Sequence, residues 1–178
     1  QNALKTLESQ QVSGYLLDLR GNPGGILDAG IAIADMWLSQ GTVVSVQERD
    51  NPRQTATANA SSLTAKPLVV LVDRESASAS EILSAALQDN KRAVLVGTTT
   101  LGKGLVQSFE PLNDSSGVLV TIAKYFTPKG QNIHKTGINP DILVESSGGE
   151  IGAKEGDRQY QTALVTLGKL LQRQVQAK

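Results

Sequence analysis

The sequence of 178 residues contains no cysteine and a single histidine, His134. Without cysteine, the chain forms no disulfides and has no thiolate metal site. One histidine leaves no pair of imidazoles to hold a metal ion, and the carboxylates show no calcium-loop spacing. His134 stands in a turn-rich segment with no motif around it, so we expect a surface residue and no metal site.

Aromatic residues make up only 3% of the chain and the formal net charge is zero, so the composition argues against binding to nucleic acid or an anionic membrane. No apolar run approaches the roughly 18 residues needed to span a bilayer. With 39% hydrophobic and 19% charged residues, we expect one globular domain. The first residue is Gln1 and no secretory leader is present, so we expect a piece of a longer protein.

Apolar strand patterns alternate with helical ones, which predicts an α/β domain. Strands are predicted at residues 15–19, 42–46, 68–72, 93–96, 105–109, 118–125 and 142–144. Helices are predicted at residues 3–10, 26–38, 78–88 and 157–176. Residues 50–65 are interpreted as a hairpin or mobile loop, and 146–149 as a flexible joint. The last helix carries an apolar stripe of Tyr160, Ala163, Leu164, Leu167, Leu170 and Leu171.

Ser78 begins the predicted helix 78–88, and two roles fit that position. In a capping box, its hydroxyl accepts from the helix while Glu81 reaches back to its N–H. Alternatively, Ser78 is a nucleophile, because free N–H groups at a helix start favour developing negative charge. The N–H of Ala79 would then donate to an oxyanion. Ser76 and Ser80 are rival nucleophiles by type, and Ser80 is expected to pack.

Lys103 is the candidate base for this nucleophile. Its neighbours at 101–106 are apolar or glycine, which predicts burial that disfavours the charged ammonium. A neutral amine accepts a proton from a serine hydroxyl. Gln107 lies four residues further on, on the same face of an expected strand, where its amide would hold the amine in position. The competing interpretations are a solvated lysine and a surface glutamine.

Two glycine-rich segments add alternatives. The turn at 21–25 follows a buried strand and either makes a connection that needs a positive φ or offers backbone N–H groups to an oxyanion. Residues 97–103 match the start of a nucleotide-binding P-loop, G-x-x-x-x-G-K. That match fails at Gly104, where a Ser or Thr is required, and because a strand rather than a helix is predicted next. There is also no S-x-x-K motif.

Four motifs in order carry a resemblance to a known family: DLRGNPGG (18–25), SASASEI (76–82), ALQDNKRA (86–93) and GKGLVQ (102–107). From about residue 14 to 145 the chain resembles the carboxyl-terminal processing proteases, also called tail-specific proteases. The resemblance implies an α/β, crotonase-like (ClpP/crotonase) β-β-α core with a C-terminal helix. It also implies a serine endopeptidase with a Ser–Lys dyad, in which Ser78 is the nucleophile, Lys103 the general base and Gln107 the residue that orients the lysine.

The same resemblance assigns further roles. Gly24 and Ala79 supply oxyanion N–H groups, and Asp89 falls at a family position linked to activity, although a structural role at the helix end also suits it. No cofactor is expected. Substrates are proteins or peptides recognised by a nonpolar free C-terminus, and the family is exported to a bacterial periplasm or thylakoid lumen.

Members of this family carry a PDZ domain before the catalytic region, and residues 1–13 cannot form one. We therefore expect the catalytic core at 1–145, without its PDZ domain, and a linker with a helix packing on the core at 146–178. Two alternatives remain: a catalytically inactive fragment that binds peptides, and a P-loop nucleotide-binding domain.

Overall fold

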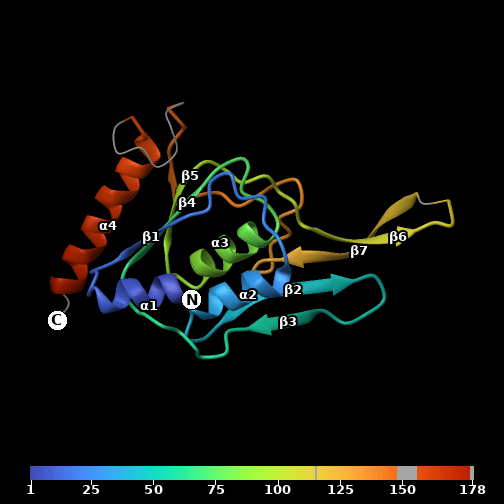
Figure 1. Cartoon of the computed structure of the whole chain (residues 1–178), viewed down its shortest axis with the longest axis horizontal. Coiled ribbons are helices and arrows are strands. Elements are labelled where there is room, and N and C mark those ends of the chain that lie inside the picture. Colours follow the sequence, from blue (N-terminus) through green and yellow to red (C-terminus); the bar gives the residue numbers. More distant parts are fainter. Residues whose placement is uncertain (115, 148–155, 177–178) are drawn as a thin grey trace.

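The computed structural model describes residues 1–114, 116–147 and 156–176, and a parallel sheet lies at its centre (Figure 1). The strands of this sheet, in spatial order, are β1 (Tyr15–Asp18), β4 (Leu68–Val72), β5 (Val94–Gly97) and β8 (Ile142–Leu143). Each neighbouring pair is parallel. The connections between these strands therefore cross over the sheet. This arrangement agrees with the α/β domain predicted from the alternation of strand and helix patterns.

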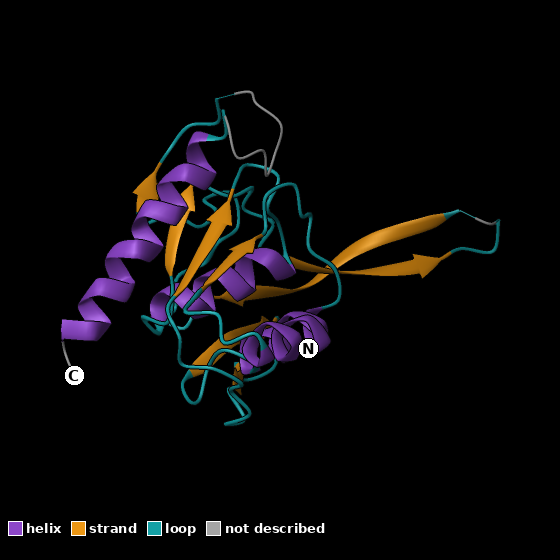
Figure 2. Cartoon of the chain, turned by 60° about the vertical axis from the view of Figure 1, so that its left-hand side comes forward, coloured by secondary structure: helices purple, strands orange, loops and turns teal. Residues whose placement is uncertain are grey.

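A second, antiparallel sheet lies beside the first. Its strands, in spatial order, are β3 (Gln54–Thr57), β2 (Thr42–Glu48), β7 (Gly117–Phe126) and β6 (Leu105–Pro111). Residues 50–65, interpreted as a hairpin or mobile loop, contribute β3, which pairs with β2 outside that range. The far part of the β6–β7 pair projects from the body as a two-stranded ribbon (Figures 1 and 2).

Helices cover both faces of the parallel sheet (Figure 2). They are α3 (Ala79–Asp89) on one face and α4 (Arg158–Gln176) on the other. The remaining helices are α1 (Asn2–Ser9) and α2 (Leu27–Asp35), and α2 packs against α3. Alternate residues of β4 point to opposite faces: Val70 joins the cluster that contains α3, and Val69 joins the cluster that contains α4. This burial on two faces explains the continuous apolar run of β4.

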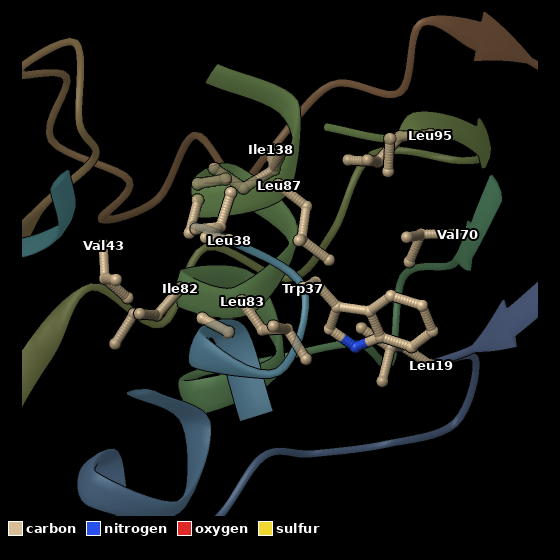
Figure 3. Close-up of a cluster of buried hydrophobic side chains, with 14 of the residues drawn as sticks. Leu19, Trp37, Leu38, Val43, Val70, Ile82, Leu83, Leu87, Leu95 and Ile138 are labelled. Atoms are coloured by element: carbon tan, nitrogen blue, oxygen red, sulfur yellow. The ribbon is translucent and has the colours of Figure 1, made fainter. Parts of the chain in front are cut away.

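The larger core cluster lies between the parallel sheet and α3 (Figure 3). Its centre includes Trp37, whose ring packs edge-on against Tyr15 with the centroids 5.2 Å apart. Helix α2 ends at Asp35 rather than at residue 38 as predicted. The apolar pattern continues past that point because Trp37 and Leu38 leave the helix and enter the core, where both are buried.

Helix α4 covers the other face of the sheet. Ala163 is fully buried there, and Tyr160, Leu167 and Leu170 pack around it. Leu164 is 40% exposed, so its assignment to the apolar stripe was wrong. The joint predicted at 146–149 lies partly outside the described residues. In the part of the chain that the structure describes, no helix is long and apolar enough to cross a membrane.

Candidate functional site

Ser78 sits on a sharp backbone turn between β4 and α3. Its φ of 55° and ψ of −118° are unusual for a residue with a side chain, and an ordinary N-cap is extended instead. Strained backbone of this kind is concentrated at functional sites. Ser78 is half-buried, whereas Ala77 and Ala79 on either side are buried. The capping box with Glu81 is also present, so the structural role predicted for Ser78 is confirmed.

Glu81 does far more than complete that cap. Its side chain is fully buried, and its carboxylate accepts hydrogen bonds from three backbone N–H groups and from one hydroxyl. The donors are the N–H groups of Ser78 (2.9 Å), Gly102 (2.7 Å) and Lys103 (2.8 Å) and the Oγ1 of Thr100 (2.5 Å). A buried charge is tolerated when it is hydrogen-bonded in this way.

The Glu81 carboxylate brings the two candidate catalytic residues together. The N–H groups of Ser78 and Lys103 donate to the same oxygen, Oε2, so their backbones lie within two hydrogen-bond lengths of each other. Sequence reasoning identified Glu81 only as a capping residue. The motif gave no sign that this carboxylate is buried and bonded to a loop about twenty residues away.

The prediction that Lys103 is buried was wrong, because its side chain is exposed. The flanking glycines explain this: a Cβ on Gly102 would lie 2.9 Å from the Gly137 nitrogen, and one on Gly104 would lie 2.5 Å from the His134 nitrogen. The backbone of the loop is therefore pressed into the protein and the lysine between the glycines turns outward. Among the described residues, the Lys103 amine has no hydrogen-bond or ion-pair partner, and Ser78 is not bonded to it.

Gln107 lies in β6 and is exposed. Lys103 precedes β6 by two residues, so strand alternation does not by itself place the two side chains on one face. The pairing shifts between Val106, opposite Ala123, and Gln107, opposite Thr121. The extra residue of this bulge belongs to β7, which leaves the alternation of β6 intact. The orienting role of Gln107 stays a prediction.

The glycine turn lies directly against the start of α3. Gly24 has a φ of 93°, and a Cβ there would come within 2.4 Å of the Ala77 carbonyl oxygen and 2.8 Å of the Ala79 nitrogen. The two predicted oxyanion residues are therefore neighbours. Gly24 donates its N–H to Oδ1 of Asn22 at 2.9 Å. The Ala79 N–H, at the first position of α3, has no partner among the described residues.

Asp89 lies at the far end of α3, about 15 Å along the helix from Ala79 at 1.5 Å per residue. Its carboxylate accepts the Lys129 N–H at 3.0 Å and pairs with the Lys129 ammonium at 3.2 Å. These contacts fix the turn at 127–130 to the end of α3. They match the structural alternative for Asp89, which does not reach Ser78.

The two rival nucleophiles, Ser76 and Ser80, are buried and have structural roles. Ser76 is fully buried, and its hydroxyl donates to the Leu19 carbonyl at 2.8 Å. Ser80 is 4% exposed and packs as expected. His134 is half-buried against Gly104 rather than on the surface, and within the described residues its Nδ1 has no hydrogen-bond partner.

The P-loop alternative does not fit this geometry. The segment after Lys103 is strand β6, and the N–H groups of Gly102 and Lys103 donate to a carboxylate where a P-loop would present them to phosphate. Among the residues that the structure describes, no three His, Asp or Glu side chains gather closely enough to hold a metal ion.

Comparison with known proteins adds independent findings. Residues 1–144 match the model of peptidase family S41. The chain is 53% identical over 166 residues to the carboxyl-terminal-processing protease of Synechocystis sp., covering 92% of this chain and 39% of that protein. It is 45% identical over 161 residues to carboxyl-terminal-processing peptidase 3, chloroplastic, of Arabidopsis thaliana, covering 86% of this chain and 31% of that protein.

A solved structure agrees with these relatives. The photosystem II D1 C-terminal processing protease superposes with a TM-score of 0.75 at 43% sequence identity, over 81% of this chain and 38% of that one. The chain therefore spans less than two-fifths of each of these three proteins.

Proposed function

Because the chain belongs to peptidase family S41, we propose that it carries the catalytic region of a serine endopeptidase that cleaves proteins with a nonpolar free C-terminus. The observation that supports this most directly is the Glu81 carboxylate, whose Oε2 accepts the N–H groups of both Ser78 and Lys103. A strained serine and a lysine held side by side suit nucleophilic catalysis.

In the proposed reaction, Ser78 Oγ attacks the carbonyl carbon of the scissile peptide bond while its proton passes to the Lys103 amine. The N–H groups of Ala79 and Gly24 stabilise the oxyanion. When the C–N bond breaks, the lysine returns the proton to the leaving amine. Water then attacks the acyl-enzyme with Lys103 again as base, which releases the acid and restores Ser78. Gln107 orients the lysine.

The reaction requires two changes from the structure described above. The Lys103 side chain turns from solvent toward Ser78, which its rotatable bonds permit without moving the anchored backbone. The Gly24 N–H exchanges the Asn22 oxygen for the oxyanion. A bound substrate excludes water around Lys103. Loss of water favours the neutral amine, which is the form that accepts the Ser78 proton.

The proposal extends to the longer protein. Residues 1–145 form a crotonase-like catalytic core on which α4 packs, and a PDZ domain elsewhere in the protein captures the substrate tail by strand addition. An exported location, in a periplasm or a thylakoid lumen, is consistent with relatives from a bacterium and from a chloroplast.

The test is cleavage of an unstructured protein with a nonpolar C-terminus by the unmodified chain and by Ser78→Ala and Lys103→Ala. Lys169→Ala removes an exposed lysine of α4 and serves as the matched control. We expect both site variants to lose cleavage and the control to retain it. The same variants are also tested in a longer protein that carries a PDZ domain.

Three outcomes separate the alternatives. Cleavage that depends on Ser78 in the longer protein but is absent in the short chain means that the site is correct and needs the added region. Binding of the peptide without hydrolysis in either form supports the inactive peptide-binding fragment. Cleavage that survives Ser78→Ala contradicts the proposed mechanism.

A further inference from the structure

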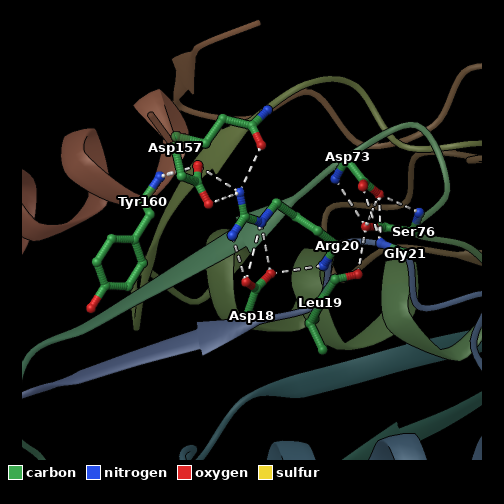
Figure 4. Close-up of polar contacts among 9 residues, drawn as sticks. Asp18, Leu19, Arg20, Gly21, Asp73, Ser76, Asp157 and Tyr160 are labelled. Carbon is green, nitrogen blue, oxygen red and sulfur yellow. Dashed lines mark hydrogen bonds and ion pairs between the residues drawn. The ribbon is translucent and has the colours of Figure 1, made fainter. Parts of the chain in front are cut away.

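Asp73, which directly follows β4, joins two segments that are far apart in the sequence (Figure 4). The N–H of Gly21, 52 residues away, lies 3.0 Å from each of its carboxylate oxygens. The N–H groups of Glu75 and Ser76 donate to Oδ1 at 3.0 and 2.9 Å. Hydrogen bonds to an ionised carboxylate are roughly twice as strong as neutral ones. One side chain therefore ties the glycine turn to the loop before Ser78.

Ser76 and its neighbour complete this connection. The Ser76 hydroxyl donates to the Leu19 carbonyl at 2.8 Å and accepts the Asp73 N–H at 3.0 Å. The Ala77 N–H donates to the Asn22 carbonyl at 3.0 Å. Because Ser76 is fully buried, these bonds are shielded from water and hold the two segments in one arrangement.

We propose that Asp73, acting with Ser76, is the positioning residue that sets the width of the oxyanion hole. The inference rests on the proposed function above. Gly24 lies three residues beyond Gly21, and Ala79 lies three residues beyond Ser76. The two oxyanion donors thus lie on two short segments that are both hydrogen-bonded to the Asp73 carboxylate. Among the described residues, that carboxylate is not bonded to Ser78.

The geometry makes this arrangement sensitive to the carboxylate. Oxyanion donors must lie about 2.7–3.1 Å from the developing charge, and a misplacement of roughly 1 Å costs about 100-fold in rate. In Asp73→Asn the remaining oxygen can still accept backbone N–H groups, but an NH₂ group replaces the second oxygen and sets a donor against the Gly21 N–H. We expect the glycine turn to shift and kcat to fall by roughly 10- to 100-fold, with KM little changed.

The experiment compares two inhibitors that share one peptide. A peptide aldehyde adds Ser78 Oγ to its carbonyl carbon, its oxygen becomes an oxyanion and the serine proton passes to Lys103. The matching peptide alcohol forms no adduct and measures binding alone. In Asp73→Asn we expect the aldehyde to bind at least about tenfold more weakly and the alcohol to bind as before. A merely structural role would weaken both.

Controls make each outcome decisive. Asp141→Asn changes another carboxylate that accepts a backbone N–H, that of Leu95 at 2.8 Å, and both affinities should stay as in the unmodified chain. If Asp73→Asn does not fold, Ser76→Ala tests the same connection. Equal loss of the two inhibitors, or unchanged aldehyde binding in a folded variant, overturns the positioning role. If the unmodified chain forms no aldehyde adduct, the comparison is made in the longer protein that carries a PDZ domain. No adduct in that protein either overturns the proposed function and this inference with it.

Discussion

At the scale of single residues, two carboxylates organise the site: the buried Glu81 and the half-buried Asp73. Glu81 anchors the lysine loop and Asp73 anchors the glycine turn. Both accept several backbone N–H groups. Around Glu81, these groups would otherwise be left unsatisfied inside the protein, at a cost of about 1–3 kcal/mol each. The position of Ser78, Lys103 and Gly24 therefore depends on residues that take no part in the proposed chemistry.

Glu81→Gln tests the first of these carboxylates. The amide keeps one accepting oxygen but places an NH₂ group against N–H donors, so we expect a loss of about 1–3 kcal/mol in the free energy of unfolding and weaker cleavage. Urea unfolding gives the first quantity and a peptide assay the second. Glu110→Gln, an exposed carboxylate on β6, is the control. Equal stability of the two variants would contradict the anchoring role of Glu81.

Gly24→Ala tests the close approach of the glycine turn to α3. The added methyl would meet the Ala77 oxygen at 2.4 Å at a φ of 93°, so we expect lower thermal stability and loss of cleavage. At Gly25 a Cβ meets nothing within 4 Å, so Gly25→Ala is a matched control one residue away. Melting curves and cleavage rates of the pair should differ clearly; matching behaviour would argue against the crowding at Gly24.

At the scale of elements, buried polar contacts fix helices to the parallel sheet. The Arg20 guanidinium, just after β1, pairs with Asp18 at 2.7 Å and with Asp157, at the start of α4, at 2.9 Å (Figure 4). The hydrogen bond with Asp18 and, less strongly, that with Asp157 raise the pKa of Arg20, although burial opposes this. Asp157 also accepts the Tyr160 N–H at 2.9 Å and so caps α4.

Arg20→Leu should loosen α4. Removing a buried cation from between two carboxylates costs about 3–5 kcal/mol in the free energy of unfolding, and hydrogen exchange should rise first in α4. Arg74→Leu removes the exposed pair with Glu145 and should cost less than about 1 kcal/mol. Exchange in α4 that is the same in both variants would show that Arg20 does not secure this helix.

Helix α1 is secured by a contact that depends on pH. The Glu8 carboxylate accepts the Lys66 ammonium at 2.6 Å and the Tyr15 hydroxyl, and these two bonds lower the pKa of Glu8 to about 2. Burial, and next the Glu8 bond, raise the pKa of Tyr15 to about 12. The contact therefore stabilises the fold between these limits. Its contribution is lost as pH falls from about 4.5 to 2, and again as pH rises from about 10 to 12.

Trp37 reports on this contact because its ring packs against Tyr15. We expect the urea midpoint, followed by Trp37 fluorescence, to fall at both ends of the pH range. In Glu8→Gln the acid-side decrease should shrink, since the variant has no carboxylate to protonate at position 8. An acid limb that is unchanged in Glu8→Gln would assign the effect to other carboxylates.

At the scale of the whole molecule, the β6–β7 ribbon stands apart from an otherwise well-packed body (Figure 2). It presents Phe109 and Leu119, opposite each other in the pairing and each 62% exposed. β6 lies at the edge of its sheet. An apolar edge strand promotes association between molecules when no other segment packs over it.

We therefore expect this chain to self-associate at high concentration and Leu119→Ser to reduce the effect with little change in thermal stability. Sedimentation velocity over a concentration series measures it. Val175→Ser removes an apolar side chain that is 76% exposed near the end of α4 and is the control. Association that responds to Val175 rather than Leu119 would locate the contact on α4 instead.

Much of the secondary structure could be predicted from local sequence patterns. The apolar run of β4, the alternation of strands and helices and the capping box at Ser78 depend on residues close together in the sequence. Motif order and spacing were sufficient to select the family, which the match over residues 1–144 bears out. Periodicity and residue type act within a few positions, so one sequence contains that information.

Contacts between distant segments were decided by the tertiary structure. Lys103 is exposed because its flanking glycines pack on a turn some thirty residues away, which its apolar neighbours did not indicate. Glu81 and Asp73 hold the loops in place because folding brings loop N–H groups around their carboxylates. The sequence alone does not show which carboxylates are hydrogen-bonded in this way. Leu164 follows the apolar period of α4 yet is 40% exposed and does not join the cluster that packs on the sheet. The sequence by itself determined which chemical groups are present and in what order, whereas burial and hydrogen bonding depend on which segments pack together.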